Sequence, residues 1–127
     1  MKETTVKLFD DHDMEIVKTM RSLGQDRRTS RMVAFLLNQK EADSREIELG
    51  ADLRQPEVSM AAADLIDAGW VEFKLVRDPT DPKRARKVYR LVISTKEVVE
   101  GFWDRVEEEH KIKLDAVTKL TNLFNPK

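Results

Sequence analysis

One continuous stretch, from Ser44 to Ile93, constrains the fold of this 127-residue chain more than any other part. Its pattern of apolar residues predicts a short helix over 44–50 and, after a turn, a second helix over 56–68. Alternating apolar and polar residues then predict strands over 70–77 and 87–93. The stretch therefore predicts a helix–turn–helix followed directly by a β-hairpin.

The boundaries within this stretch have identifiable causes. Pro56 suits the first position of a helix, because its missing N–H has no partner there, and Gly69 suits the end of one. The nine residues between the strands, DPTDPKRAR over 78–86, contain two prolines and no glycine. A segment of this length and composition predicts an extended loop rather than a tight hairpin turn.

Three further helices are expected outside this stretch, over 11–23, 27–39 and 95–124. The last contains roughly 30 residues, about 45 Å of helix, which is too long to pack fully on the preceding domain. Its apolar stripe predicts pairing with a second copy of the chain. The stripe residues expected at this dimer interface are Val99, Trp103, Val106, His110, Leu114, Val117, Leu120 and Phe124.

Composition excludes several classes of site and protein. The chain has no cysteine, which excludes disulfides, thiolate zinc sites and thiol redox switches. Its longest apolar runs, such as MVAFLL over 32–37, are far too short to cross a bilayer, and residues 1–13 show no apolar signal region. We therefore expect a soluble cytoplasmic protein with no membrane partner.

The charge of the chain is unevenly distributed. The formal net charge of −1 combines a net −5 over residues 1–73, a net +5 over 74–94 and a net −1 over 95–127. A compact segment with five excess positive charges attracts phosphate if it projects from the domain. The hairpin region is therefore a candidate nucleic-acid contact.

The sequence LRQPEVSMAAADLIDAGWVEF, over 53–73, resembles the helix–turn–helix of winged-helix transcription regulators, especially archaeal members of the MarR/ArsR/TrmB-like group. QPEVS over 55–59 and L-x-x-x-GWV over 65–71 carry the resemblance, and VRDPTDPKRAR over 76–86 resembles the wing of MarR-like proteins. The resemblance covers about residues 30–94. No named effector ligand follows from it.

The resemblance implies an α+β, mainly helical fold: a winged helix–turn–helix with a two- or three-stranded β-wing and a long C-terminal dimerisation helix. Residues 1–94 are the expected DNA-binding domain and 95–127 the expected dimerisation helix. The implied function is a homodimeric regulator that binds double-stranded DNA. The alternative is a winged-helix subunit that uses the same fold to bind proteins, without specific base readout.

In such a fold the helix over 56–68 enters the major groove with its first residues nearest the bases. There Arg54 can pair with guanine, Gln55 with adenine, and Glu57 can accept from cytosine. Gln55 and Glu57 can equally serve only to cap the helix start. The candidate base-reading residues are Arg54, Gln55, Glu57, Ser59 and Met60, and no Arg or Lys lies within 56–68.

The basic wing is expected over residues 77–90, with Lys83, Arg84, Arg86 and Lys87 on phosphate or in the minor groove. The alternative is a solvated charged surface without a partner. Three more arginines, Arg27, Arg28 and Arg31, lie in the first turns of the helix over 27–39, where positive charge opposes the helix dipole. They are expected either to pair with nearby carboxylates or to contact the DNA backbone.

Enzyme chemistry finds little support in the sequence. His12 and His110 are the only histidines and lie far apart. His12 belongs to the DDHD segment over 10–13, which has metal-ligand residue types but is better explained by capping of a helix start. No Gly-rich phosphate loop, nucleophile motif or paired-carboxylate motif is present. We therefore expect no enzymatic activity, no cofactor and no metal.

Overall fold

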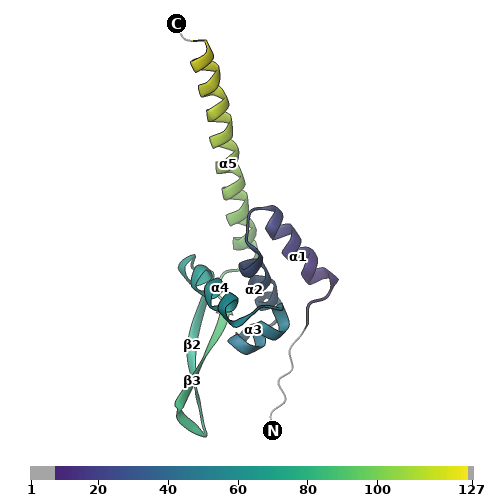
Figure 1. Ribbon diagram of the computed structural model, residues 1–127, viewed down its shortest axis with the longest axis vertical. Helices are drawn as coiled ribbons and strands as arrows, with labels where there is room; N and C mark the ends of the chain where they lie inside the picture. The colour runs from purple at the N-terminus through teal and green to yellow at the C-terminus, as the bar shows by residue number, and fades with distance from the viewer. Residues whose placement is uncertain (1–7, 126–127) are drawn as a thin grey trace. The chain divides into compact units, whose positions relative to one another are not determined.

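The computed structural model describes residues 8–125, apart from the side chain of Pro82. In chain order, the elements are α1 (Asp11–Ser22), α2 (Arg27–Asn38), β1 (Glu41–Asp43), α3 (Ser44–Ala51), α4 (Gln55–Asp67), β2 (Val71–Asp78), β3 (Asp81–Leu91) and α5 (Thr95–Phe124) (Figure 1). All five expected helices are present. Contacts divide the chain into two compact units between Ile93 and Ser94, and each unit is described by itself.

The first unit is built around α2. Met32, Val33 and Phe35 of this helix are almost completely buried, and α1, α3 and α4 all pack against α2. The helix α3 contributes Ile47, and α4 contributes Val58 and Leu65, to the same core. The two helices of the helix–turn–helix are therefore held in place by a third helix that comes earlier in the chain.

The sheet has three antiparallel strands in the order β1-β3-β2, and this is the three-stranded form of the expected wing. Strand β1 was not predicted, because three residues carry too little alternation to be recognised. It pairs with β3 through Ala42 opposite Tyr89. Both of these side chains are buried, so β1 ties the base of the hairpin to the helical core.

The prediction of an extended loop over 78–86 was wrong. Strands β2 and β3 pair continuously from Val71 opposite Leu91 to Arg77 opposite Ala85, and only Pro79 and Thr80 lie between them. In Figure 1 this hairpin extends well beyond the helices of its unit.

The side chain of Asp78 explains how so tight a turn forms without glycine. Its carboxylate accepts hydrogen bonds from the backbone N–H of Thr80 at 2.9 Å and from the Thr80 hydroxyl at 2.7 Å. Aspartate side chains commonly stabilise turns through such contacts to residues two positions further on. The wing is therefore a long β-ribbon rather than a short hairpin with a loose tip.

The acidic segment at the start of α1 caps that helix, as its residue types indicated. The Asp10 side chain accepts from the backbone of Asp13 at 2.9 Å, and the Asp13 side chain accepts from the backbone of Asp10 at 3.0 Å. Asp13 is buried and also accepts from Asn38 Nδ2 at 2.5 Å, which fastens α1 to the end of α2.

The described part of the chain holds neither a metal-ion cluster nor a membrane-spanning helix. Among residues 8–125, no three His, Asp or Glu side chains lie close enough together to hold a metal ion. No helix in this range combines the length and apolar character that crossing a membrane needs.

One glycine is required by the packing of the core. A Cβ atom on Gly50 would lie 2.0 Å from the ring of Phe35, which is itself buried. We predict that Gly50→Ala lowers the free energy of unfolding by about 1–3 kcal/mol, the usual cost of an overpacked core. Chemical denaturation measures this change.

Gly101 provides the matched control, because it lies in α5 and a Cβ atom there would meet nothing within 4 Å. Gly101→Ala should raise stability slightly, by up to about 1 kcal/mol, through its better helix propensity. Equal effects from the two substitutions would contradict the assigned role of Gly50.

Candidate nucleic-acid interface

The turn between α3 and α4 sets how α4 is presented. The helix α3 ends at Ala51, and its C-cap, Asp52, adopts a left-handed conformation with φ of 52°. Leu53 follows and is buried, which anchors the turn to the core. Arg54 then occupies the N-cap of α4, so α4 begins at Gln55, one residue before the predicted start.

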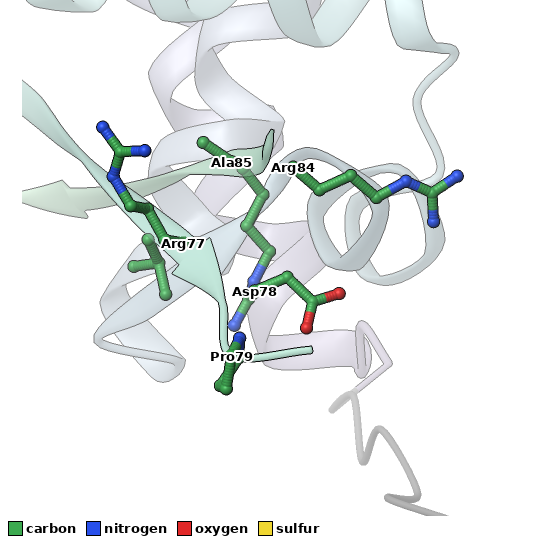
Figure 2. Close-up of a pocket in the computed structure, with 7 residues that line it drawn as sticks. Arg77, Asp78, Pro79, Arg84 and Ala85 are labelled. Atoms are coloured by element: carbon green, nitrogen blue, oxygen red, sulfur yellow. The ribbon is translucent and has the colours of Figure 1, made fainter. Parts of the chain in front are cut away.

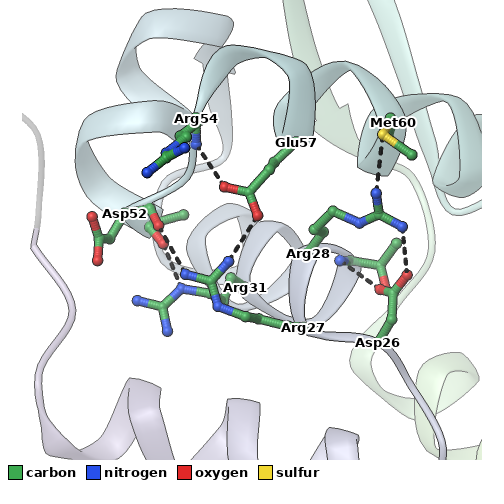
Figure 3. A network of polar contacts seen from close by, with 10 residues as sticks. Asp26, Arg27, Arg28, Arg31, Asp52, Arg54, Glu57 and Met60 are labelled. Atoms are coloured by element: carbon green, nitrogen blue, oxygen red, sulfur yellow. Dashed lines mark hydrogen bonds and ion pairs between the residues drawn. The ribbon is translucent and has the colours of Figure 1, made fainter.

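Two arginines of α2 hold this turn, and we call Arg27 and Arg31 the arginine clamp (Figure 3). Arg31 Nε donates to the carbonyl of Ala51 at 2.6 Å, and Arg27 donates to the carbonyl of Asp52 at 3.4 Å. A cation at the C-terminal carbonyls of a helix is favourable. Burial is the main cause of a lowered pKa for Arg31, and the neighbouring positive charge of Arg27 adds to it.

The clamp also reaches the start of α4 through Glu57. Arg27 forms an ion pair with Glu57 Oε2 at 2.9 Å, and the backbone N–H of Arg54 donates to Glu57 Oε1 at 3.0 Å. The Arg54 hydrogen bond is the main reason that the pKa of Glu57 is lowered. The capping interpretation of Glu57 is therefore confirmed, and its carboxylate faces α2, as Figure 3 shows.

The third arginine of α2, Arg28, also forms polar contacts within the fold. Arg28 lies 3.7 Å from Asp26, which caps α2, and its NH1 group donates to the sulfur of Met60 at 3.0 Å. The expectation that these arginines pair with nearby carboxylates is thus confirmed for Arg27 and Arg28, whereas Arg31 binds a backbone carbonyl instead. Their role is to join α2 to the helix–turn–helix.

The helix α4 has one buried face and one exposed face. Val58, Ala61, Ala62 and Leu65 pack into the core. The exposed face carries Gln55, Ser59, Met60 and Ala63. Gln55 Nε2 donates to Ser59 Oγ at 3.1 Å, so these two polar groups form one small hydrogen-bonding unit at the start of the helix.

A hollow of about 400 Å³ brings this start of α4 together with two other elements. Its lining residues are Asp43, Ser44, Arg45, Gln55, Ser59, Arg86, Lys87 and Tyr89. The start of α3, the start of α4 and the base of the wing thus share one concave surface. The sequence reasoning missed Ser44 and Arg45, although Arg45 could have been found as an exposed cation in the first turn of α3.

Three cations of the hairpin are paired with acids. Lys74 lies 3.1 Å from Glu41, Arg90 pairs with Glu72, and Arg86 lies 2.5 Å from Asp43. Lys87 instead lies over the ring of Phe73, with its Nζ atom 4.7 Å from the ring centroid. The net +5 counted from the sequence therefore overstates the positive charge available at the base of the wing.

The tip of the wing keeps its basic character. Lys83 and Arg84 are exposed there. Arg77 and Arg84 border a second hollow, of about 590 Å³, and Figure 2 shows their guanidinium groups extending away from each other. Hydrogen bonds from the Thr80 side chain and backbone lower the pKa of Asp78, and the charge of Arg84 adds to this effect.

The second unit contains α5, and its predicted interface residues lie exposed along it. Val99, Trp103, Val106, Leu114, Val117, Leu120 and Phe124 are 39–76% exposed, and His110 is exposed as well. Within residues 95–124 this is a continuous apolar stripe open to solvent.

Solved structures with the same fold are transcription regulators and a chromatin protein. A possible transcriptional regulator from Methanosarcina mazei Go1 has a TM-score of 0.63 at 10% sequence identity, over 84% of this chain and 86% of that one. A MarR-family regulator from Silicibacter pomeroyi has a TM-score of 0.52 at 19% identity, over 91% of this chain and 82% of that one. The archaeal chromatin protein TrmBL2 has a TM-score of 0.62 at 18% identity, over 90% of this chain and 42% of that one.

No protein-family model and no curated protein sequence matches the chain. The structural similarity nevertheless confirms the resemblance that the residues of α4 and the wing indicated. The fold of this chain is the winged helix–turn–helix of MarR-like regulators, with the β2–β3 hairpin as its wing.

The lowered pKa of Glu57 predicts a pH-dependent contribution to stability. A carboxylate whose pKa falls below its ordinary value of 4.5 on folding stabilises the folded chain above that pH. This contribution is lost as the pH falls through the lowered pKa. We predict that Glu57→Gln lowers the melting temperature at pH 7 and that its difference from the natural chain shrinks towards pH 3.

Thermal unfolding followed by circular dichroism across this pH range checks the prediction. Glu15→Gln, which removes an exposed acid of α1, is the control for the general loss of one negative charge. A difference between Glu57→Gln and the natural chain that stays constant from pH 7 to pH 3 would contradict the assignment.

Proposed function

We propose that this chain is a DNA-binding transcriptional regulator that acts as a homodimer, without enzymatic activity. The observation that carries the proposal is the concave surface shared by the start of α3, the exposed face of α4 and the base of the wing. In winged-helix proteins these are the elements that meet the backbone, the major groove and the flanking groove of DNA. TrmBL2, which shares the fold, is described as a chromatin protein with a novel mode of DNA binding.

The cations around this surface fit contacts to the DNA backbone. Arg45 on the first turn of α3 is exposed and lines the hollow, and Arg54 at the N-cap of α4 is exposed and directly precedes Gln55, which also lines it. Lys87 lines the hollow, and Lys83 and Arg84 lie further out on the wing. Contacts from these residues to phosphate give affinity and orientation, but they carry no sequence information directly.

Recognition of the DNA bases is assigned to the uncharged, exposed side chains of α4. Gln55 can make paired hydrogen bonds with adenine, whereas Met60 and Ala63 offer apolar contacts to a thymine methyl group. Ser59 Oγ accepts the hydrogen bond from Gln55, and its hydroxyl can still donate to an acceptor on either base of a pair. Glu57 is left in a structural role because both of its oxygens are already engaged. The α4 face therefore favours A·T pairs over G·C pairs.

A second candidate function is a winged-helix subunit that binds another protein. It is favoured by the acid pairing of Lys74, Arg86 and Arg90, and by Asp64 and Asp67 on the exposed surface of α4. Binding to genomic DNA fragments at low salt, with specific and random competitor DNA, separates the two functions. A regulator retains some fragments against random competitor, and a protein-binding subunit retains none.

Selection of bound DNA from a random pool tests the role of α4. We expect a two-fold symmetric site, with A·T pairs at the positions nearest Gln55. Gln55→Ala should cost about 1–3 kcal/mol at one base position per half-site and relax the preference there. Asp67→Ala, at the far end of α4, is the matched control and should leave the selected sequence unchanged. A selected site unaffected by Gln55→Ala would contradict the assigned readout.

The tip of the wing should supply affinity without sequence preference. We predict that Lys83→Ala combined with Arg84→Ala weakens binding to all DNA sequences alike and reduces the slope of log affinity against log salt. Each lost phosphate contact changes that slope by about 0.9. Mobility-shift titrations at several salt concentrations measure both effects.

The control for this pair is Lys18→Ala combined with Arg21→Ala, which removes the same charge from the exposed surface of α1. It should change affinity much less. Loss of affinity for one sequence only, after the wing substitutions, would show that the wing reads bases instead of phosphate.

A further inference from the structure

Most of the exposed stripe of α5 is symmetric about one point on the helix. Leu114 is the exception, because its mirror position is Glu109. Val106 and Val117 are equally far from the midpoint between Lys111 and Ile112. The same holds for Trp103 with Leu120, for Val99 with Phe124, and for His110 with Lys113. All eight residues are exposed on this helix. A stripe with this symmetry is matched to a second copy of itself that runs in the opposite direction.

The sizes of the paired side chains favour the same arrangement. Antiparallel pairing places the large Phe124 against the small Val99, and Trp103 against Leu120. Parallel pairing would instead place each Trp103 and each Phe124 against its own copy, between layers of valine. Interfaces pack uniformly when large and small side chains face each other. The antiparallel register therefore gives layers of more even width.

The charges of α5 are also polarised along the helix. Residues 95–110 contain six acidic and two basic side chains, whereas residues 111–125 contain three basic and one acidic. Glu107, Glu108 and Glu109 form a continuous acidic run just before Lys111 and Lys113. Parallel pairing would bring the two acidic runs together. Antiparallel pairing instead brings each acidic run beside the lysines of the other copy, and opposite charges across a helix pair favour that orientation.

We propose that α5 pairs with α5 of a second copy as an antiparallel coiled coil whose two-fold axis passes between Lys111 and Ile112. This rests on the homodimer of the proposed function and specifies its orientation and register. Val106 lies against Val117 of the second copy, and His110 lies against Lys113. The polar central layer costs stability but fixes the register, because a shift would place these side chains against apolar ones.

The proposal sets the distance between the two attachment points of the winged domains. Each α5 begins at Thr95, about 16 residues from the axis, so the two starting points lie about 50 Å apart at 1.5 Å per residue. In a parallel pair the same points would be separated only by the helix spacing of about 8–10 Å.

Disulfide trapping tests the register. Because the chain contains no cysteine, any disulfide that forms must involve the introduced residues. Val106→Cys and Val117→Cys are made singly in the full chain, one of them carrying a short tag. After oxidation we expect a mixed disulfide dimer when the two variants are refolded together, and no disulfide dimer from either variant alone. In the antiparallel register Val106 lies about 16 Å along the axis from its own copy, too far for a disulfide.

Light scattering of the natural chain separates failure of the register from failure of the dimer. A monomer would overturn both the homodimer and this proposal. A dimer in which Val106→Cys and Val117→Cys each link to themselves would overturn the antiparallel register alone. Spin labels at Lys96→Cys give an independent distance, expected at about 45 Å in the antiparallel dimer. A short distance there would overturn the proposal as well.

Discussion

The arrangement of the helix–turn–helix depends on the arginine clamp. Arg31 and Arg27 bind the carbonyls at the end of α3, and Arg27 also binds the carboxylate at the start of α4. Hydrogen bonds to charged groups are stronger than neutral ones, and here they join three helices at one turn. The angle between α3 and α4 is therefore set from α2. These arginines are used inside the fold, so the surface of α4 is left to uncharged side chains.

Ion pairs within the fold also determine which cations of the wing remain unpaired with acids. Acids from β1 and β2 neutralise cations near the base of the hairpin, whereas Lys83 and Arg84 at the tip stay exposed. Arg86 illustrates the point, because its partner Asp43 is the residue that caps α3. The wing is therefore fastened at its base and basic at its tip. In the proposed function, this arrangement separates the phosphate contacts of the wing tip from the base contacts of α4.

Local signals in the sequence were enough to predict the helices, because apolar periodicity, Pro56 and Gly69 each act within one element. They were not enough for the hairpin, whose length depends on the contact between Asp78 and Thr80 and on pairing between distant residues. The geometry of the candidate site could be predicted only in part for the same reason. Gln55 and Ser59 follow from their place in α4, but the partners of Arg27 and Arg86 lie 30 and 43 residues away. Charge counts along a chain cannot reveal such neutralisation.

One winged domain has a limited basic surface, so in the proposed function its binding to DNA depends on α5 joining it to a second domain. Exposed cations at the start of α3, the start of α4 and the wing are few, so a single domain has modest phosphate affinity. Joining two such domains makes the second contact intramolecular, and the gain depends on whether the connection can span both sites. An antiparallel α5 pair is a stiff connection with one fixed length. The proposed function and the proposed α5 pairing together therefore couple DNA affinity and the preferred distance between half-sites to the packing of α5, although none of its stripe residues needs to touch DNA.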